Sequence, residues 1–176
     1  MPEKRLFSAL AAVISLIPVA ACSAPIAPPR ATSPCEAVPE RALTGRVSDH
    51  AGVLDAEAEA RLDTQLAALA QRRGHQTVIA TVPTLDGRDI AAEATCLGNR
   101  WGIGDTARDD GILVLVATSD RKVRVATGTG ATASLTDDEA AEVIGAMTPA
   151  FRDGDMAGGL EQGIARIEAL TGPGTP

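Results

Sequence analysis

The feature that most constrains the fold is a pair of consecutive strand patterns in the middle of the chain. Residues 111–117 form an uninterrupted apolar run, which is typical of a strand covered on both faces. After a turn at residues 119–122, residues 122–127 alternate, with Val123 and Val125 facing one side. The two segments predict a β-hairpin whose first strand is buried on both faces.

Amphipathic patterns before the hairpin predict two helices and a further strand. Asp55 fits an N-cap, apolar residues then recur every three or four positions, and Gly74 fits the end of the helix. Residues 76–82 predict a strand that Pro83 ends. A second helix is expected to begin near Asp89, and one apolar face of it consists of Ile90, Ala94, Leu97 and Trp101.

Two more helices are expected after the hairpin. Thr136 and Glu139 have the spacing of a capping box, which marks the start of a third helix. We expect Pro149 to break this helix, because proline lacks an N–H and clashes with the preceding turn. The last helix has an apolar face of Met156, Leu160, Ile164 and Ile167. The alternation of strands and amphipathic helices predicts an α/β fold, with a small mixed sheet of about three to four strands and about four helices.

The first 22 residues resemble the export signal of a bacterial lipoprotein. Lys4 and Arg5 precede an apolar run over residues 6–17, which is short for a membrane span. Cys22 follows two alanines, as does the diacylated cysteine of a lipobox. We therefore expect lipidation at Cys22 and an extracytoplasmic protein anchored to the membrane of the cell envelope. The alternative is a plain secretory signal in which Cys22 is incidental.

Residues 23–42, which follow this signal, are rich in Pro and Ala and predict an extended tether. A domain over residues 43–170 and a disordered tail at 171–176 complete the expected organisation.

Two cysteines remain after the expected signal, Cys35 and Cys96. An even pair in an oxidising compartment usually forms a disulfide. Cys96 falls off the apolar face of the second helix, so we expect it to point towards solvent, where Cys35 from the tether would cover it. The alternative is a free Cys96. A metal site at these cysteines is disfavoured, because the chain has no CxxC motif or nearby histidine spacing.

Charge and motifs exclude several classes of function. The net charge of −7 argues against nucleic acid, which needs a basic surface. The chain has no GxSxG motif and no P-loop, and His50 and His75 are its two histidines. We therefore expect no organic cofactor.

Acidic residues gather near the hairpin in the sequence. Asp109 and Asp110 precede the first strand, residues 128–130 follow the antiparallel second strand, and Asp137 comes after a short loop. The topology therefore predicts that these residues lie at one end of the sheet, where oxygen ligands could bind Ca²⁺. Each acid also has a structural explanation, because Asp137 lies in a first helical turn and residues 109–111 have the composition of a turn. The residues alone favour the structural explanation.

From about residue 47 to 167 the chain resembles the TPM domain family. The matching segments occur in the same order as in the family, at residues 48–54, 101–104, 109–116, 120–125, 135–137 and 149–155. The resemblance implies a three-layer α/β/α sandwich, a divalent cation such as Ca²⁺ at an acidic cluster, and acid-phosphatase activity in some members. By position, the matching acids are Asp49, Asp109 and Asp137.

The chain also departs from the family pattern near the hairpin. The family often has Gly-Tyr-Gly-Leu-Glu-Gly where this chain has residues 128–134, so an aromatic side chain and a carboxylate are missing. Asp110 stands where the family usually has Asn and could restore one charge. The expected metal ligands are therefore Asp49, Asp109, Asp110 and Asp137.

Two functional hypotheses follow from these observations. The first is a membrane-anchored, extracytoplasmic accessory or binding protein that recognises a protein of the envelope, with any cation serving the structure. The second is a weak, cation-dependent phosphomonoester hydrolase in which Arg121 or Arg124 holds the phosphate. The first is preferred, because a carboxylate is missing and no general acid or base is evident.

Overall fold

A computed structural model describes residues 34–132 and 135–171 of the chain. The expected signal with Cys22, most of the predicted tether and nearly all of the predicted tail lie outside these residues. Within residues 34–132 and 135–171, no helix combines the length and the apolar content that crossing a bilayer requires. The elements are η1 (Pro34–Ala37), β1 (Val47–Asp49), α1 (Ala56–Arg73), β2 (Thr77–Val82), α2 (Ile90–Trp101), β3 (Ile112–Ala117), β4 (Lys122–Thr127), α3 (Asp137–Arg152) and α4 (Met156–Leu170).

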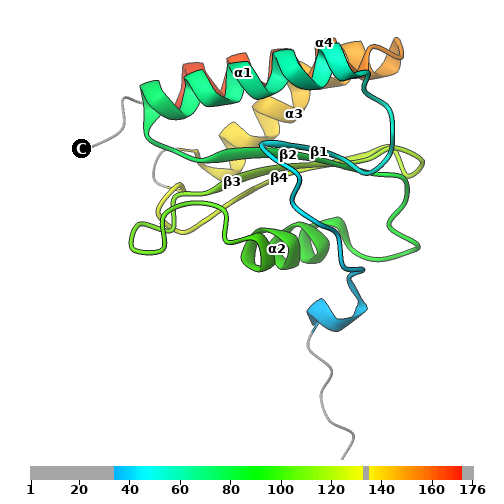
Figure 1. Ribbon diagram of the computed structural model, residues 1–176, viewed down its shortest axis with the longest axis horizontal. Helices are drawn as coiled ribbons and strands as arrows, with labels where there is room; N and C mark the ends of the chain where they lie inside the picture. Colours follow the sequence, from blue (N-terminus) through cyan, green and yellow to red (C-terminus); the bar gives the residue numbers. More distant parts are fainter. Residues whose placement is uncertain (1–33, 133–134, 172–176) are drawn as a thin grey trace, which may run out of the picture. The chain divides into compact units, whose positions relative to one another are not determined.

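The domain is a three-layer α/β/α sandwich, as the family resemblance implies. The helices α1, α3 and α4 cover one face of the sheet and α2 covers the other (Figure 1). The sheet is mixed, with the order β1-β2-β3-β4. β2 pairs in parallel with both β1 and β3, and β3 and β4 form the predicted antiparallel hairpin. The predicted fold class is confirmed.

β1 is a strand that the sequence analysis did not identify. It has three residues, which is too short for a recognisable alternation of polar and apolar side chains. Its register pairs Asp49 with Thr81 of β2, and Thr81 in turn pairs with Val116 of β3. The register therefore fixes the end of the sheet at which Asp49 lies.

The two parallel connections have opposite hands. From β1 to β2 and from β2 to β3 the chain steps in the same direction across the sheet. However, α1 and α2, which make these connections, lie on opposite faces (Figure 1). One of the two crossovers therefore departs from the right-handed rule that parallel units follow almost always.

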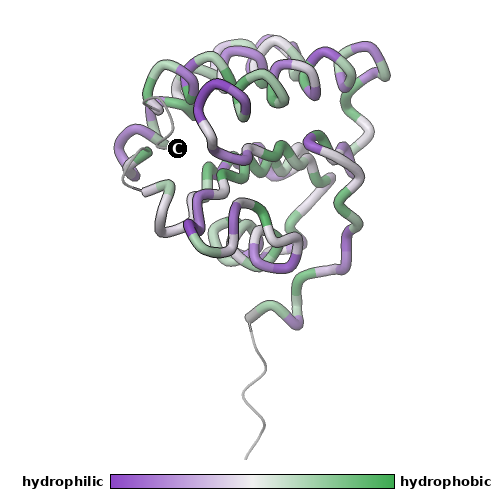
Figure 2. The backbone as a smooth tube through the Cα atoms, turned by 60° about the vertical axis from the view of Figure 1, so that its left-hand side comes forward, coloured by the Kyte–Doolittle hydropathy of each residue, from purple (hydrophilic) through white to green (hydrophobic). Residues whose placement is uncertain are grey.

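The sheet separates two hydrophobic cores, which explains the uninterrupted apolar run of β3. Ile112, Val114 and Val116 contribute to the core shared with α1, α3 and α4. Leu113 and Leu115 contribute to the core under α2. Figure 2 shows the hydrophobic strands between the helical layers. Because both faces of β3 are buried, all six of its residues are apolar.

Helix boundaries follow the predicted caps. The Asp55 side chain accepts a hydrogen bond from the N–H of Ala58, and Gly74 closes α1 with a φ of 76°. Asp89 caps α2 in the same way, and the capping box of Thr136 and Glu139 begins α3. These local hydrogen bonds satisfy backbone donors that the first turn of a helix leaves without partners.

Pro149 does not break α3, so this expectation was wrong. The helix continues to Arg152 with Pro149 inside its last turn. The proline removes the hydrogen bond that would reach the carbonyl of Gly145, but both residues are exposed, so water can reach that carbonyl. The apolar face of Met147 and Ala150 is buried and keeps the last turn on the sheet.

Candidate functional site

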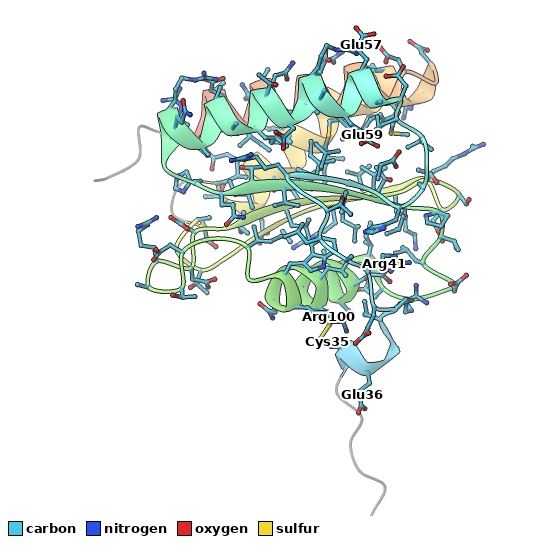
Figure 3. The ribbon with its side chains drawn as sticks, in the orientation of Figure 1. Cys35, Glu36, Arg41, Glu57, Glu59 and Arg100 are labelled. Carbon is cyan, nitrogen blue, oxygen red and sulfur yellow. A yellow bond between two sulfur atoms is a disulfide. The ribbon has the colours of Figure 1, made fainter. Side chains whose placement is uncertain are left out.

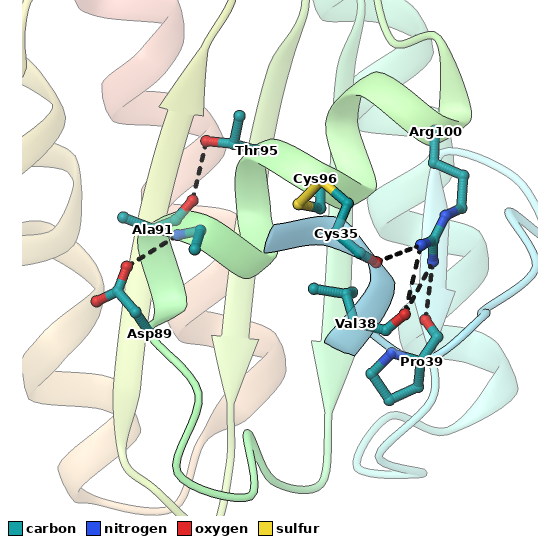
Figure 4. The surroundings of a disulfide bond; sticks show 9 residues. Cys35, Val38, Pro39, Asp89, Ala91, Thr95, Cys96 and Arg100 are labelled. Atoms are coloured by element: carbon teal, nitrogen blue, oxygen red, sulfur yellow. Dashed lines mark hydrogen bonds between the residues drawn. A yellow bond between two sulfur atoms is a disulfide. The ribbon is translucent and has the colours of Figure 1, made fainter. Parts of the chain in front are cut away.

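The described part of the predicted tether is fastened to α2. Cys35 and Cys96 form a disulfide with a Cα–Cα distance of 5.3 Å (Figure 4). Cys96 does not point towards solvent as expected, because its residue is only 4% exposed. The short helix η1 packs on α2, and Val38 joins the core beneath it, so the sulfur atom of Cys96 is covered. The disulfide is therefore a buried link between η1 and α2.

Hydrogen bonds from α2 hold the same segment along its length. The Arg100 guanidinium donates to the carbonyls of Cys35, Val38 and Pro39 (Figure 4). The Trp101 indole N–H donates to the carbonyl of Arg41 at 2.8 Å. Backbone carbonyls that an extended tether would leave to water are thus bound by side chains of the domain.

A buried ion pair completes this attachment. Glu93 of α2 has a fully buried side chain and accepts from Arg41 at 2.8 Å and from Arg88 at 2.7 Å. Figure 3 shows Cys35, Arg41 and Arg100 together on the α2 side of the sheet. A buried carboxylate requires such partners, so removal of Arg41 would leave a charge half compensated. Residues 35–41 therefore pack as part of the domain.

The acidic loop before β3 contacts the loop after β4, as the hairpin topology predicted. One carboxylate oxygen of Asp109, Oδ2, accepts from both the N–H and the hydroxyl of Thr129, each at 2.8 Å. These two hydrogen bonds lower the pKa of Asp109 from its ordinary value. Asp109 is exposed and adopts a positive φ of 47°. Its carboxylate thus joins the two loops.

Asp110 points inward and is already neutralised. Its carboxylate accepts from the N–H of Asp105 at 2.8 Å and from the Arg108 guanidinium at 2.7 Å. Burial alone would raise the pKa of Asp110, but these hydrogen bonds and the charge of Arg108 outweigh burial and lower the pKa. Both oxygens of Asp110 therefore serve the structure of the loop.

Backbone packing brings the two loops together more closely than side chains would allow. A Cβ atom on Gly128 would lie 2.2 Å from the carbonyl oxygen of Asp109, and one on Gly130 would lie 1.7 Å from that of Arg108. Only glycine fits at these two positions. A cleft of about 210 Å³ lies beside this junction, between α2 and the hairpin, with Thr95, Asp109 and Thr129 among its lining residues. We call this region the acidic end.

The structure does not bring the four predicted metal ligands together. Asp49 lies at the opposite end of the sheet, because β1 runs parallel to β3 and Asp49 follows β1 whereas Asp109 precedes β3. Strand residues rise about 3.3 Å each, so Asp49 and Asp110 are roughly 20 Å apart along the strand direction. Asp49 there accepts from the N–H of Leu54 at 2.8 Å and from the Thr81 hydroxyl.

Asp137 is also separate from the acidic loop. Its side chain is 95% exposed and lies 3.9 Å from the guanidinium of Arg124, in β4. Within the described ranges, no three His, Cys, Asp or Glu side chains are grouped so that they could hold a metal ion. The four acids therefore do not fit a single Ca²⁺ site, which would need several converging oxygens.

The two arginines proposed to hold a phosphate lie in different surroundings. Arg124 is the partner of Asp137. Arg121, in the turn between β3 and β4, lines a cavity together with Lys122 and Arg152. Arg152 is the last residue of α3, and nothing in the sequence indicated that it lies beside the hairpin turn.

Comparison with known proteins identifies the family of this domain. The fold and its loops define an α/β/α domain whose hairpin is braced by glycine-rich loops. Residues 47–170 match the family model TPM_phosphatase, described as the TPM domain, so the chain belongs to the TPM domain family. Among curated proteins no significant match is found.

Solved structures with the same fold include three bacterial domains. The N-terminal domain of a protein from P. gingivalis is 27% identical, with a TM-score of 0.66, and the match covers 72% of this chain and 82% of that one. The N-terminal domain of cg2496 protein from Corynebacterium glutamicum is 14% identical, with a TM-score of 0.60 and coverages of 79% and 93%. BA42 protein from Bizionia argentinensis is 19% identical, with a TM-score of 0.60 and coverages of 66% and 80%.

Proposed function

We propose that the chain is an extracytoplasmic accessory protein that is anchored to the membrane through Cys22 and binds a protein of the cell envelope. The observation that carries this proposal is the attachment of residues 35–41 to α2 through the Cys35–Cys96 disulfide. Disulfides persist in oxidising compartments, which supports an exported protein. The attachment also means that residues 35–41, at the end of the Pro-rich segment, are held by the domain.

Fractionation of a bacterial host that processes lipoproteins tests the anchor. The wild-type chain should sediment with membranes and stay there after an alkaline wash, whereas Cys22→Ser should appear in the soluble extracytoplasmic fraction. Cys96→Ser serves as the matched control, because it removes a cysteine but leaves the lipobox intact. Equal partitioning of the wild type and Cys22→Ser would contradict the anchor.

For a cation, the structure supports a narrower proposal than the four-acid site. Asp109 is an exposed acid at the acidic end, and nearby Thr129 and loop carbonyls could supply further oxygens. One carboxylate would bind Ca²⁺ weakly, because affinity rises with the number of charged ligands. Calorimetric titration with CaCl₂ tests this proposal, and the heat should be lost in Asp109→Ala but kept in Asp137→Ala.

The alternative function, weak cation-dependent phosphomonoester hydrolysis, has less support from the geometry. Asp110 and Asp49 are occupied by hydrogen bonds within the fold, so neither is poised as a base. Turnover of a chromogenic phosphate ester by the purified chain tests this alternative. Activity that disappears with a chelator and with Asp109→Ala would favour the enzyme over the accessory protein.

A further inference from the structure

A cavity of about 540 Å³ lies at the end of the sheet opposite to the acidic end. Its walls come from the turn between β3 and β4 and from the turn between α3 and α4. The apolar part of its lining includes Val116, Val123, Phe151 and Met156. The size falls in the range of small-molecule sites, which run from about 300 to 1,000 Å³.

The polar part of the lining is cationic. Arg121, Lys122 and Arg152 are exposed and line the cavity, and no carboxylate is among its lining residues. In the described part of the chain, none of these three side chains forms an ion pair. Three neighbouring cations without acidic partners repel one another, and an anion among them would relieve this repulsion.

Two of the acids near the cavity are directed elsewhere. Asp120 accepts from the N–H of Leu85, at 2.9 Å, and so turns away to the opposite face of the sheet. Asp155 caps α4 by accepting from the N–H of Gly158 at 2.8 Å. Their hydrogen bonds explain why these carboxylates do not neutralise the lining.

The hairpin turn sets the backbone conformation of Arg121. Its φ is 52°, in the left-handed region that favours glycine or asparagine. The residue closes the turn between β3 and β4, where its N–H donates to the carbonyl of Thr118 at 3.3 Å. The hairpin turn therefore fixes the position of Arg121 beside the cavity.

We propose that this cavity binds a small organic anion that combines a phosphate or carboxylate head with an apolar group. The guanidinium groups of Arg121 and Arg152 suit the two oxygens of such a head, and Lys122 adds a third charge. The surface of Val116, Val123, Phe151 and Met156 takes the apolar group. The site does not depend on the lipid anchor or on a cation at Asp109.

Titration of the full chain, with its disulfide formed, by octyl phosphate and by octanoate below their micellar concentrations tests the proposal. Amide NMR shifts should concentrate in residues 116–123 and 148–156. Either ligand binding there supports the site, and the tighter one identifies the head group. Inorganic phosphate should bind at least tenfold more weakly, because it lacks the apolar group, and so should octyl glucoside, because it lacks the charge.

Charge-removing variants locate the binding. Arg152→Gln and Arg121→Gln should each weaken octyl phosphate binding at least fivefold. Arg61→Gln is the matched control, because it removes the same charge from the outer surface of α1 and should change affinity less than twofold. The proposal is overturned if neither amphiphile binds, if octyl glucoside binds equally well, or if Arg61→Gln weakens binding as much as Arg152→Gln.

Discussion

The acidic end and the cationic cavity lie at opposite ends of one sheet, and they differ in whether their charged side chains have bonding partners. At the acidic end, Asp110 is buried and bonded to Arg108, and Asp109 is bonded to Thr129. At the cavity, Arg121 and Arg152 are exposed and unpaired among the residues described. Asp110 therefore holds its own loop in shape and Asp109 joins that loop to the one after β4, whereas the cations contribute little to the fold and remain available to a ligand.

This contrast shows why charge in the sequence is a poor guide to binding capacity. Acidic residues cluster along the chain near the hairpin and match a family pattern. In Asp49 and Asp110, however, both carboxylate oxygens accept hydrogen bonds within the fold. The cations at the cavity, by contrast, have no ion-pair partner among the described residues. They are Arg121, Lys122 and Arg152, from two segments that are far apart in the sequence. Five predictions test whether one end is structural and the other is not.

The largest effect is expected from Gly130→Ala at the acidic end. The added Cβ would overlap the carbonyl oxygen of Arg108, so the loops must separate. We expect a loss of about 3 kcal/mol in the free energy of unfolding, measured by urea denaturation. Gly98→Ala is the control, because its Cβ would meet nothing within 4 Å and should be neutral or stabilising. Equal stability of the two variants would mean that the loops are not packed as described.

The next effect is expected from Asp110→Ala. Removing this carboxylate leaves the N–H of Asp105 without its acceptor and Arg108 without the closer of its two acidic partners. We expect a loss of about 2 kcal/mol at pH 7 by urea denaturation. Asp110→Asn should cost less, because its amide oxygen can still accept from the Asp105 N–H.

The same variant predicts a pH dependence. The pKa of Asp110 is lower in the folded state than its ordinary value. The ionised carboxylate therefore contributes fully to the free energy of unfolding at pH values above the ordinary pKa. Below it, the unfolded chain binds the proton first, and stability is lost as the pH falls towards the folded pKa. The difference between wild type and Asp110→Ala should therefore shrink as the pH falls below about 5. A difference that grows in acid would contradict this assignment.

Much of this architecture could be predicted from the sequence, because it rests on local signals. Capping residues such as Asp55 and Thr136, together with the apolar run of β3, depend on neighbours within a few positions. β1 is too short for periodicity, and missing it also misplaced Asp49, whose end of the sheet follows from strand direction. The position of Arg152 beside the hairpin turn depends on how segments distant in the sequence meet, which no local pattern encodes.

A smaller effect is expected from Arg121→Gly at the cavity. Glycine adopts a φ near 52° without steric cost, whereas arginine pays about 1 kcal/mol or more there. The greater freedom of glycine in the unfolded chain offsets part of this gain. We expect a net stabilisation of about 0.5 kcal/mol by urea denaturation, together with weaker octyl phosphate binding. Destabilisation would mean that the Arg121 side chain has a structural role.

The smallest effect is expected from Arg152→Gln, which should change the free energy of unfolding by less than about 0.5 kcal/mol, because an exposed, unpaired cation contributes little. Arg108→Gln is the matched variant at the acidic end and should cost about 1 kcal/mol, because it leaves the buried Asp110 with a neutral donor in place of a charged one. Side-by-side urea denaturation at low salt measures both. If Arg152→Gln cost as much as Arg108→Gln, the cavity would be a structural element as well, and the contrast between the two ends of the sheet would fail.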